Sequence, residues 1–348
     1  MREVLGDIDR WRQQDTPVAL ATVIETWGSA PRQAGAKMAM TADGQISGSV
    51  SGGCVEGAVY DAALEVLTGG PSRLLHFGVA DETAWDVGLA CGGELTVFVE
   101  RLDPAVYTFM HGLLDRDVPF AEATVVGGPG SMLGRKLLIQ RGGRLFGHID
   151  VRLDAAVGAS ARATLSRPSA NGKIFEADVD DDPVRVFIQP HQPQPTLVMV
   201  GGVHIAVALD RIAQTLGYRT VVIDPRRAFG NETRFPEVTA LIQAWPEEAL
   251  EEIQITPATA VALLTHDPKI DDPALRFVLS SSAFYVGALG SERTHAARRQ
   301  RLREAGIPNA QIARIRAPIG LDIGAQTPEE IALAIMAEVV ATRRGQPD

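Results

Sequence analysis

The second half of the chain alternates between short apolar runs and longer segments in which apolar residues recur at helical spacing. Apolar strands that alternate with helices are typical of a parallel sheet with both faces covered. The expected strands are Thr196–Val200, Arg219–Ile223, Ala260–Leu264 and Ala283–Val286, with a helix from about Ile205 to Leu216. This pattern predicts an α/β domain built on a Rossmann-like, doubly wound parallel sheet.

A final helix is marked by its start and stop signals. Thr327 can cap it, Pro328 suits its first turn, and Glu330 completes a capping box. Arg343 and Arg344 then lie near its negative C-terminal end. These signals predict a helix that begins at Pro328.

The first half of the chain contains an internal repeat of strand-like runs and glycine turns. The copies share a Gly-Ser pair (Gly28-Ser29, Gly130-Ser131), a Gly-x-Lys segment (Gly35–Lys37, Gly134–Lys136) and a closing glycine (Gly48, Gly147). These shared positions favour duplication over a coincidence of common strand–glycine patterns. We therefore expect an α+β domain with an internally duplicated β-unit, at about 21–48 and 123–147.

The segment between the copies predicts further regular structure. Apolar residues at helical spacing predict a helix that starts near Cys54 and ends at Gly69-Gly70. Strands are expected over Ser72–Val79 and Glu94–Glu100.

A proline-rich segment, Gln189–Pro195, separates the two halves. Closely spaced prolines favour an extended, semi-rigid connector, although a long loop within one domain is an alternative. We place the domain boundary there, which gives an N-terminal domain of 1–189 and a Rossmann-like domain of 190–348.

Composition narrows the class of protein. The chain has 348 residues and a net charge of −10, which disfavours nonspecific binding to nucleic acid or anionic lipid. Its most apolar stretch, Leu197–Leu209, is shorter than the roughly 20 residues that span a bilayer. Met1–Arg12 is charged and lacks the apolar core of a signal peptide. Only two cysteines are present, so we expect a cytoplasmic protein without a disulfide scaffold.

The segment Ser51-Gly52-Gly53-Cys54 is the most informative candidate site. Successive glycines let backbone N–H groups converge on an anion. A helix that begins at Cys54 would favour a thiolate there. The second copy has no cysteine at the matching place, so the first copy is the better candidate for chemistry. The alternative is a small buried cysteine packed against glycines.

Cys91 lies in a similar glycine-rich segment, beside Gly92. Two such cysteines could converge on one soft ligand, such as a metal centre or a sulfur atom, or could form a redox disulfide. Their separation matches no compact metal motif, and we predict no metal site built from protein ligands alone.

The loop Trp27–Arg32 offers the hydroxyl of Ser29, a proline turn and the guanidinium of Arg32. This combination suits a phosphate or a pterin-like heterocycle, and the alternative is an ordinary hairpin loop with a solvated arginine.

The first loop of the second domain resembles a nucleotide-binding fingerprint with one position changed. Gly201 and Ala206 fit the first and third positions, Gly202 and His204 lie between them, and the middle position is Val203. A β-branched residue there would crowd a pyrophosphate. Asp224 follows the next strand, where an acidic residue often holds a ribose. The fold is expected, but NAD(P) binding does not follow from it.

Two later loops bring further candidates to the same expected edge of the sheet. Gly287 and Gly290 lead into a basic helix with Arg293 and His295, an arrangement that fits either an anion site or a tight strand–helix turn. His266 follows the preceding strand and could transfer a proton, act as a ligand, or simply be hydrogen-bonded in a turn.

Together these segments resemble the xanthine dehydrogenase accessory protein family of the XdhC/CoxI type, over nearly the whole chain. Matching stretches are Gly28–Arg32, Gly48–Glu56, Gly88–Gly93, Asp224–Arg226, Thr265–Asp267, Gly287–Ser291, Arg293–His295 and Pro318–Gly324. The sequence departs at Val203, where the family has glycine. The resemblance implies a maturation factor that binds the molybdenum cofactor, helps a cysteine desulfurase to sulfurate it, and delivers it to a molybdenum hydroxylase apoenzyme.

The leading hypothesis is therefore a cofactor-binding chaperone without turnover of its own, for a xanthine dehydrogenase or a carbon monoxide dehydrogenase type of enzyme. Cys54 and Cys91 would face the molybdenum or the transferred sulfur, and Ser29, Arg32 and the Ser51–Gly53 amides would hold the pterin phosphate side. The alternative is an NAD(P)-dependent oxidoreductase with a Cys54/Cys91 dithiol. A homodimer is expected only because dimers are the commonest assembly.

Overall fold

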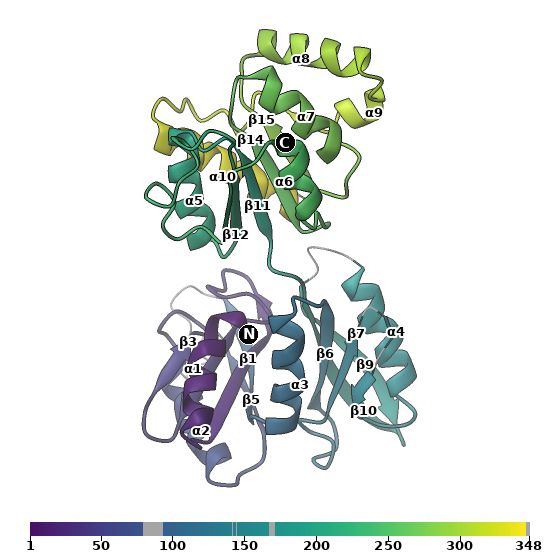
Figure 1. Cartoon of the computed structure of the whole chain (residues 1–348). Coiled ribbons are helices and arrows are strands. Elements are labelled where there is room, and N and C mark those ends of the chain that lie inside the picture. The colour runs from purple at the N-terminus through teal and green to yellow at the C-terminus, as the bar shows by residue number, and fades with distance from the viewer. Residues whose placement is uncertain (79–92, 141, 144, 167–170, 346–348) are drawn as a thin grey trace. The chain divides into compact units, whose positions relative to one another are not determined.

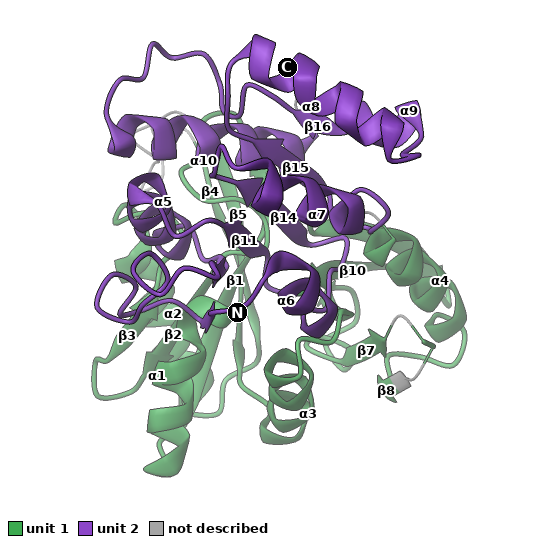
Figure 2. Ribbon diagram, turned by 45° about the horizontal axis from the view of Figure 1, so that its top comes forward, with its two compact units in different colours: residues 1–193 green, residues 194–348 purple. Residues whose placement is uncertain are grey.

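The computed structural model describes residues 1–78, 93–140, 142–143, 145–166 and 171–345. The chain divides into two compact units, Met1–Pro193 and Gln194–Asp348 (Figure 2). Each unit has hydrophobic clusters of its own.

Unit 1 is built on two five-stranded antiparallel sheets with equivalent strand orders, β3-β2-β1-β5-β4 in the first sheet and β8-β7-β6-β10-β9 in the second sheet (Figure 1). The first sheet consists of β1 (Val18–Trp27), β2 (Lys37–Thr41), β3 (Ile46–Gly48), β4 (Arg73–Phe77) and β5 (Glu94–Arg101). The second sheet consists of β6 (Phe120–Gly127), β7 (Lys136–Gln140), β8 (Leu145–Gly147), β9 (Lys173–Val179) and β10 (Asp182–His191).

The helices of unit 1 are α1 (Arg2–Gln13), α2 (Glu56–Leu67), α3 (Pro104–Asp115) and α4 (Asp154–Leu165). Alternate residues of β1 and β6 face opposite sides, as strand geometry requires. One side of each sheet packs on α2 or α4, whereas the other side contributes to clusters that join the two sheets with α1 and α3. The order of layers is therefore α2, the first sheet, the second sheet, α4.

The predicted duplication is confirmed, and it is larger than the sequence indicated. The order helix, three strands, helix, two strands runs from α1 to β5 and again from α3 to β10. Among the helices of unit 1, α2 was predicted but α1, α3 and α4 were not, because the polar residues on the exposed face of a helix are weakly constrained, whereas the turns and lysines between the strands are held by geometry.

Gly48 and Gly147 show why the glycines of the repeat are retained. Gly48 has a φ of +77°, and an added Cβ would lie 2.3 Å from the carbonyl oxygen of Lys37. Gly147 has a φ of +83°, with the same oxygen of Lys136 at 2.4 Å. Only glycine fits both the backbone conformation and the close approach.

Replacing Gly48 by alanine is expected to lower the free energy of unfolding by about 2 kcal/mol, through backbone strain and the displaced strand β2. Gly44 provides the control, because its φ is +93° but the nearest atom to an added Cβ is Tyr60 Oη at 3.8 Å. Gly44→Ala should cost only about 1 kcal/mol. Equal losses in urea unfolding would contradict the steric argument.

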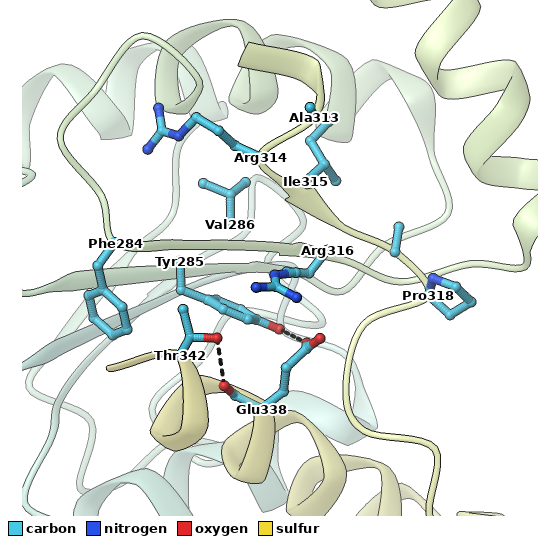
Figure 3. A pocket seen from close by; sticks show the side chains of 11 residues that line it. Phe284, Tyr285, Val286, Ala313, Arg314, Ile315, Arg316, Pro318, Glu338 and Thr342 are labelled. Atoms are coloured by element: carbon cyan, nitrogen blue, oxygen red, sulfur yellow. Dashed lines mark hydrogen bonds between the residues drawn. The ribbon is translucent and has the colours of Figure 1, made fainter. Parts of the chain in front are cut away.

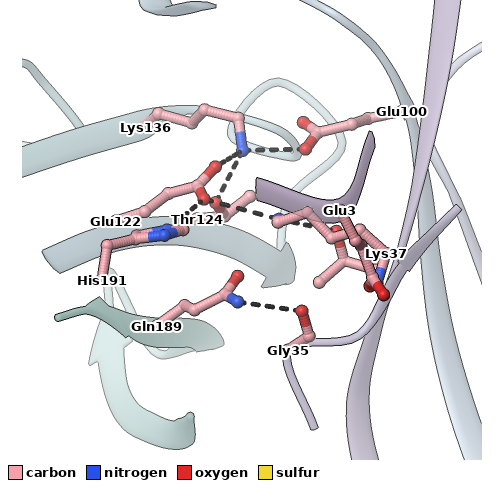
Figure 4. Close-up of polar contacts among 10 residues, drawn as sticks. Glu3, Gly35, Lys37, Glu100, Glu122, Thr124, Lys136, Gln189 and His191 are labelled. Carbon is pink, nitrogen blue, oxygen red and sulfur yellow. Dashed lines mark hydrogen bonds and ion pairs between the residues drawn. The ribbon is translucent and has the colours of Figure 1, made fainter. Parts of the chain in front are cut away.

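A buried cluster of charges joins the two sheets of unit 1 (Figure 4). Lys136 Nζ lies 2.8 Å from a carboxylate oxygen of Glu100 and 2.8 Å from one of Glu122, and Lys37 Nζ lies 3.5 Å from the other oxygen of Glu122. The two lysines occupy equivalent positions, because each donates to a threonine of the neighbouring strand, Lys37 to Thr22 and Lys136 to Thr124.

Two opposing effects set the pKa values in this cluster: burial favours the neutral form of each group, and pairing with an opposite charge favours the charged form. Burial raises the pKa of Glu122, but Lys136 and Lys37 outweigh it and hold that pKa well below its ordinary value. Burial of Glu100 prevails over its pairing with Lys136, so its pKa is raised. Burial lowers the pKa of His191 to about 4, despite its contact with Glu122. The imidazole of His191 is therefore neutral at pH 7, whereas Glu122 is held as a carboxylate between the two lysines.

The structure places the end of unit 1 later than the predicted boundary. β10 continues through Gln189, Pro190 and His191, which pair with Glu122, Ala121 and Phe120 of β6. β9 pairs with β10 only as far as Ile188, so a proline is tolerated beyond that point. The proline-rich connector is therefore shorter than expected, because three of its seven residues belong to β10.

Unit 2 contains a six-stranded parallel sheet in the order β13-β12-β11-β14-β15-β16. Its strands are β11 (Thr196–Val200), β12 (Arg219–Ile223), β13 (Ala240–Ile242), β14 (Thr259–Leu263), β15 (Tyr285–Ala288) and β16 (Ile315–Arg316). Helices α5 (His204–Thr215) and α10 (Pro328–Arg344) cover one face, and α6 (Pro246–Glu252), α7 (Pro268–Val278), α8 (Glu292–Glu304) and α9 (Asn309–Ile312) cover the other. The Rossmann-like prediction is confirmed.

The helix that the capping residues predicted in unit 2 is confirmed. Thr327 and Glu330 form the predicted capping box of α10, and Gly345 ends the helix in a left-handed conformation. The strand predicted to start at Ala283 starts at Tyr285, as β15. Among the described residues, the structure has no helix long and apolar enough to cross a bilayer.

Candidate functional site

The loop before α2 is organised around the carboxylate of Glu56. The backbone N–H groups of Ser51 (2.9 Å), Gly52 (3.0 Å) and Gly53 (2.9 Å) all donate to it. The hydroxyls of Ser49 and Ser51 also donate to it. Partial burial raises the pKa of Glu56, but these hydroxyl and backbone donors outweigh it and lower that pKa to about 2. The loop is therefore closed on an internal anion.

This arrangement changes two expectations about the loop. The Ser51, Gly52 and Gly53 amides converge as predicted, but they converge on Glu56 and are not free for a ligand in this structure. The helix begins at Glu56, after an N-cap at Val55, rather than at Cys54. Cys54 therefore precedes the first helical turn, and its side chain is exposed rather than packed against glycines.

The second copy contains a simpler version of the same loop. Asp154 is the first residue of α4, as Glu56 is of α2, and it accepts N–H bonds from Ile149 (3.0 Å) and Asp150 (3.2 Å). Between the shared glycine and the helix, the first copy has residues 49–55 and the second has 148–153. The first loop is thus longer, and Gly52, Gly53 and Cys54 stand where the second copy has Val151 and Arg152.

The loop after β1 extends beyond the same sheet, with an exposed aromatic residue at its start. Trp27 is 69% exposed. Arg32 does not reach out for a ligand, because its Nη2 lies 2.7 Å from both carboxylate oxygens of Glu3. An added Cβ on Gly93 would lie 3.1 Å from the backbone of Ser29, so the chain after the second cysteine segment returns to this loop. Cys91 and Gly92 lie outside the described residues.

In unit 2, the glycines of the first strand–helix loop are accounted for by internal contacts. An added Cβ on Gly201 would lie 2.4 Å from Thr265, and one on Gly202 would lie 2.6 Å from the carbonyl oxygen of Phe229. Asp224 is fully buried and accepts from the Gly202 N–H (2.8 Å) and from the guanidinium of Arg226 (2.8 and 2.9 Å). The carboxylate of Asp224, which was expected to hold a ribose, is therefore bonded to Arg226 instead.

The remaining candidate residues of unit 2 differ in their exposure and in their place on the sheet. His204 opens α5 and His266 follows β14, and both are exposed. Gly287 lies within β15, where an added Cβ would meet Tyr285 Oη at 2.5 Å and Ile319 at 2.6 Å, so packing explains it. Gly290 takes a φ of +131° at the turn into α8. Arg293 is exposed on that helix, whereas His295 is buried.

A pocket of about 640 Å³ in unit 2 lies elsewhere (Figure 3). Tyr285, Arg316 and Glu338 are among the residues that line it, and it follows β16 and α10 instead of the carboxyl ends of the central strands. The Tyr285 hydroxyl and the Gly320 N–H both donate to Glu338. None of the predicted site residues lines this pocket.

Comparison with known proteins identifies the family. Residues 197–339 match the family model described as the XdhC Rossmann domain, and residues 11–78 match the one described as the XdhC and CoxI family. A Bacillus subtilis (strain 168) protein named as a probable xanthine dehydrogenase subunit is 30% identical over 345 residues, covering 97% of this chain and 96% of that protein. The chain belongs to the XdhC and CoxI family.

Two further proteins are similar to this XdhC/CoxI protein over most of its length. The Escherichia coli (strain K12) protein named molybdenum cofactor insertion chaperone PaoD is 30% identical over 331 residues, which cover 94% of this chain and 84% of that protein. A crystal structure of a Bacillus halodurans protein described as a xanthine dehydrogenase superposes with a TM-score of 0.77. It is 25% identical and covers 99% of this chain and 96% of that one.

The family matches separate the two copies of the repeat in this XdhC/CoxI chain. The match over 11–78 includes the Cys54 loop and Glu56, whereas the second copy, from α3 to β10, lies between the two matches. Sequence reasoning overlooked Glu56 as a site residue, although its place at the start of the predicted helix was a signal. It also overlooked Asp271 and Arg298, which come together from two different helices.

Proposed function

We propose that this protein is a maturation factor that binds the molybdenum cofactor and assists its insertion into a molybdenum hydroxylase. The family and the names of its relatives support this role. The observation that carries it is an exposed thiol, Cys54, on a loop that is held in place by an internal carboxylate. A thiol is a soft ligand, suited to molybdenum or to a transferred sulfur atom.

The roles of individual residues follow from this arrangement. Cys54 contacts the molybdenum end of the cargo, and Cys91 supplies a second thiol. Ser29 and Trp27 border the same end of the first sheet, where an exposed indole offers a surface for a flat heterocycle. Arg32 takes part only if it leaves Glu3.

The finer parts of the proposal concern sulfur and partners. A cysteine desulfurase supplies the sulfur, and the client is a xanthine dehydrogenase or a carbon monoxide dehydrogenase type of enzyme. Because Cys54 is exposed, a persulfide carried by a partner can reach it without unfolding of the loop.

Replacing Cys54 by serine is expected to reduce cofactor retention at least about tenfold, because a hydroxyl is a poor ligand for a soft metal. Purified protein is mixed with molybdenum cofactor, and bound molybdenum is measured after gel filtration. The matched control is Val151→Ala, an exposed change in the corresponding loop of the second copy. Absence of retention by the unmutated protein, or full retention by the serine variant, would overturn the proposal.

The alternative of an NAD(P)-dependent oxidoreductase is disfavoured by the occupied Asp224 and by Val203 at the fingerprint position. Titration with NADPH, followed by its fluorescence, separates the two functions. Saturable, tight binding would favour the oxidoreductase.

A further inference from the structure

Buried polar atoms without hydrogen bonds concentrate at the start of α8. Among the residues that the structure describes, seven buried side-chain atoms lack a partner, and three of them belong to His295 and Arg298. These are His295 Nδ1 and Arg298 Nε and Nη1. Native proteins rarely leave such groups unsatisfied, so a cluster of them indicates an absent ion, water or ligand.

Arg298 is held under the loop that enters α8. Its side chain is almost fully buried, and Nη2 alone is bonded, to the Leu289 carbonyl oxygen (2.9 Å) and to Asp271 (3.2 Å). Because Leu289 lies at the carboxyl end of β15, the guanidinium is directed at the strand–helix turn. A guanidinium has five N–H donors, so an arginine bonded through Nη2 alone has more donors than its surroundings use.

One carboxylate, that of Asp271 on α7, pairs with Arg298. Asp271 also accepts the Thr265 hydroxyl, and burial raises its pKa to about 6, despite that bond and Arg298. Burial lowers the pKa of His295, and Arg299 and Arg298 lower it further. Only the shift of His295 reflects neighbouring positive charge; the raised pKa of Asp271 reflects its burial and the nearby carboxylate of Asp272.

We propose that Arg298 and His295 form a binding site for an oxyanion of the phosphate class at the N-terminal end of α8. A phosphate group offers several acceptors to a guanidinium and an imidazole, and the thirteen-residue helix adds its positive end. The three atoms are enclosed, so the anion enters when the turn from Leu289 to Ser291 shifts. The site stands independently of Cys54, which belongs to the other unit.

The test is calorimetric titration of the full chain with inorganic phosphate at constant ionic strength. The expected result is saturable binding that weakens at least about tenfold in His295→Ala and in Arg298→Met. Arg301→Met is the matched control, because Arg301 pairs with Asp272 across the same two helices but its side chain is 37% exposed. It should bind phosphate as the unmutated protein does.

Two results would overturn the proposal: no phosphate binding by the unmutated protein, or undiminished binding by His295→Ala, which keeps the Arg298–Asp271 pair and should therefore fold. Competition then identifies the source of the phosphate group. Displacement by AMP supports a nucleotide, and displacement by the molybdenum cofactor supports its pterin phosphate. The Cys54→Ser experiment measures cofactor retention, whereas this one measures the binding of inorganic phosphate, so the two proposals can fail separately.

Discussion

Replacing Glu122 by glutamine is expected to lower the free energy of unfolding by about 3–5 kcal/mol, the cost of leaving a buried charge uncompensated. Glu122 is the carboxylate shared by Lys37, Lys136 and His191 in the junction between the sheets. Without its charge, Lys136 retains Glu100, but Lys37 is left with only the hydroxyl of Thr22. Lys37, whose pKa burial already lowers, then loses the carboxylate that favours its charged form.

Urea unfolding monitored by circular dichroism measures this loss, and Glu65→Gln is the control. Glu65 pairs with Arg73 at a similar 2.7 Å, but both side chains are exposed. Its replacement should cost less than about 1 kcal/mol. Equal effects of the two substitutions would show that burial does not govern the energetics of the cluster.

The pH dependence of unfolding should carry the signature of His191. Its pKa in the folded protein, about 4, lies below the ordinary 6.5. Between these values the unfolded chain binds a proton that the folded chain does not, so stability falls as the pH falls from 6.5 towards 4. Glu122, with a folded pKa below its ordinary 4.5, adds a further loss below pH 4.5. Glu122→Gln removes this second contribution and enlarges the first, because Glu122 is one of the groups that raise the pKa of His191.

Replacing Glu56 by glutamine is expected to release the Cys54 loop while the rest of unit 1 stays folded. An amide can accept fewer N–H bonds than a carboxylate, and it carries no charge to attract the donors from Ser51, Gly52 and Gly53. After discounting for solvent screening, hydrogen exchange of these amides should accelerate about 100-fold. Cofactor retention should fall together with loop order.

The duplicated fold supplies the control for this experiment. Asp154→Asn removes the corresponding carboxylate from the second copy, where no cysteine follows the glycine. It should accelerate exchange around Ile149 and leave residues 50–55 protected. If Glu56→Gln leaves the loop amides protected, Glu56 does not hold the loop. Because its folded pKa is about 2, its contribution is complete above pH 4.5 and is lost as the pH falls towards 2.

Sequence patterns predicted those parts of the fold that depend on local geometry. Turn glycines such as Gly48, the alternation of strands and helices, and the capping box at Thr327 each have a local physical cause. The site was harder to predict from the sequence. A glycine loop whose amides converge looks the same in sequence whether the amides bind a side chain of the protein or a ligand. Only the folded structure shows that the anion is internal, because the loop amides bond to the carboxylate of Glu56.

Long-range partners were beyond such reasoning. Arg298 and Asp271 belong to different helices, and nothing in either segment indicates that they meet. Pro190 suggested a connector, but pairing with β6 placed it in a strand. Both outcomes were set by tertiary packing.

The charged junction between the two sheets of unit 1 also bears on descent. Lys37 and Lys136 are counterparts, each bonded to the matching threonine, and they approach the same carboxylate. A lone ancestral half would have exposed its inner sheet face and its lysine to water. The carboxylate itself is not duplicated, because Leu20 stands in the first sheet where Glu122 stands in the second, so the junction joins two copies that have come to differ.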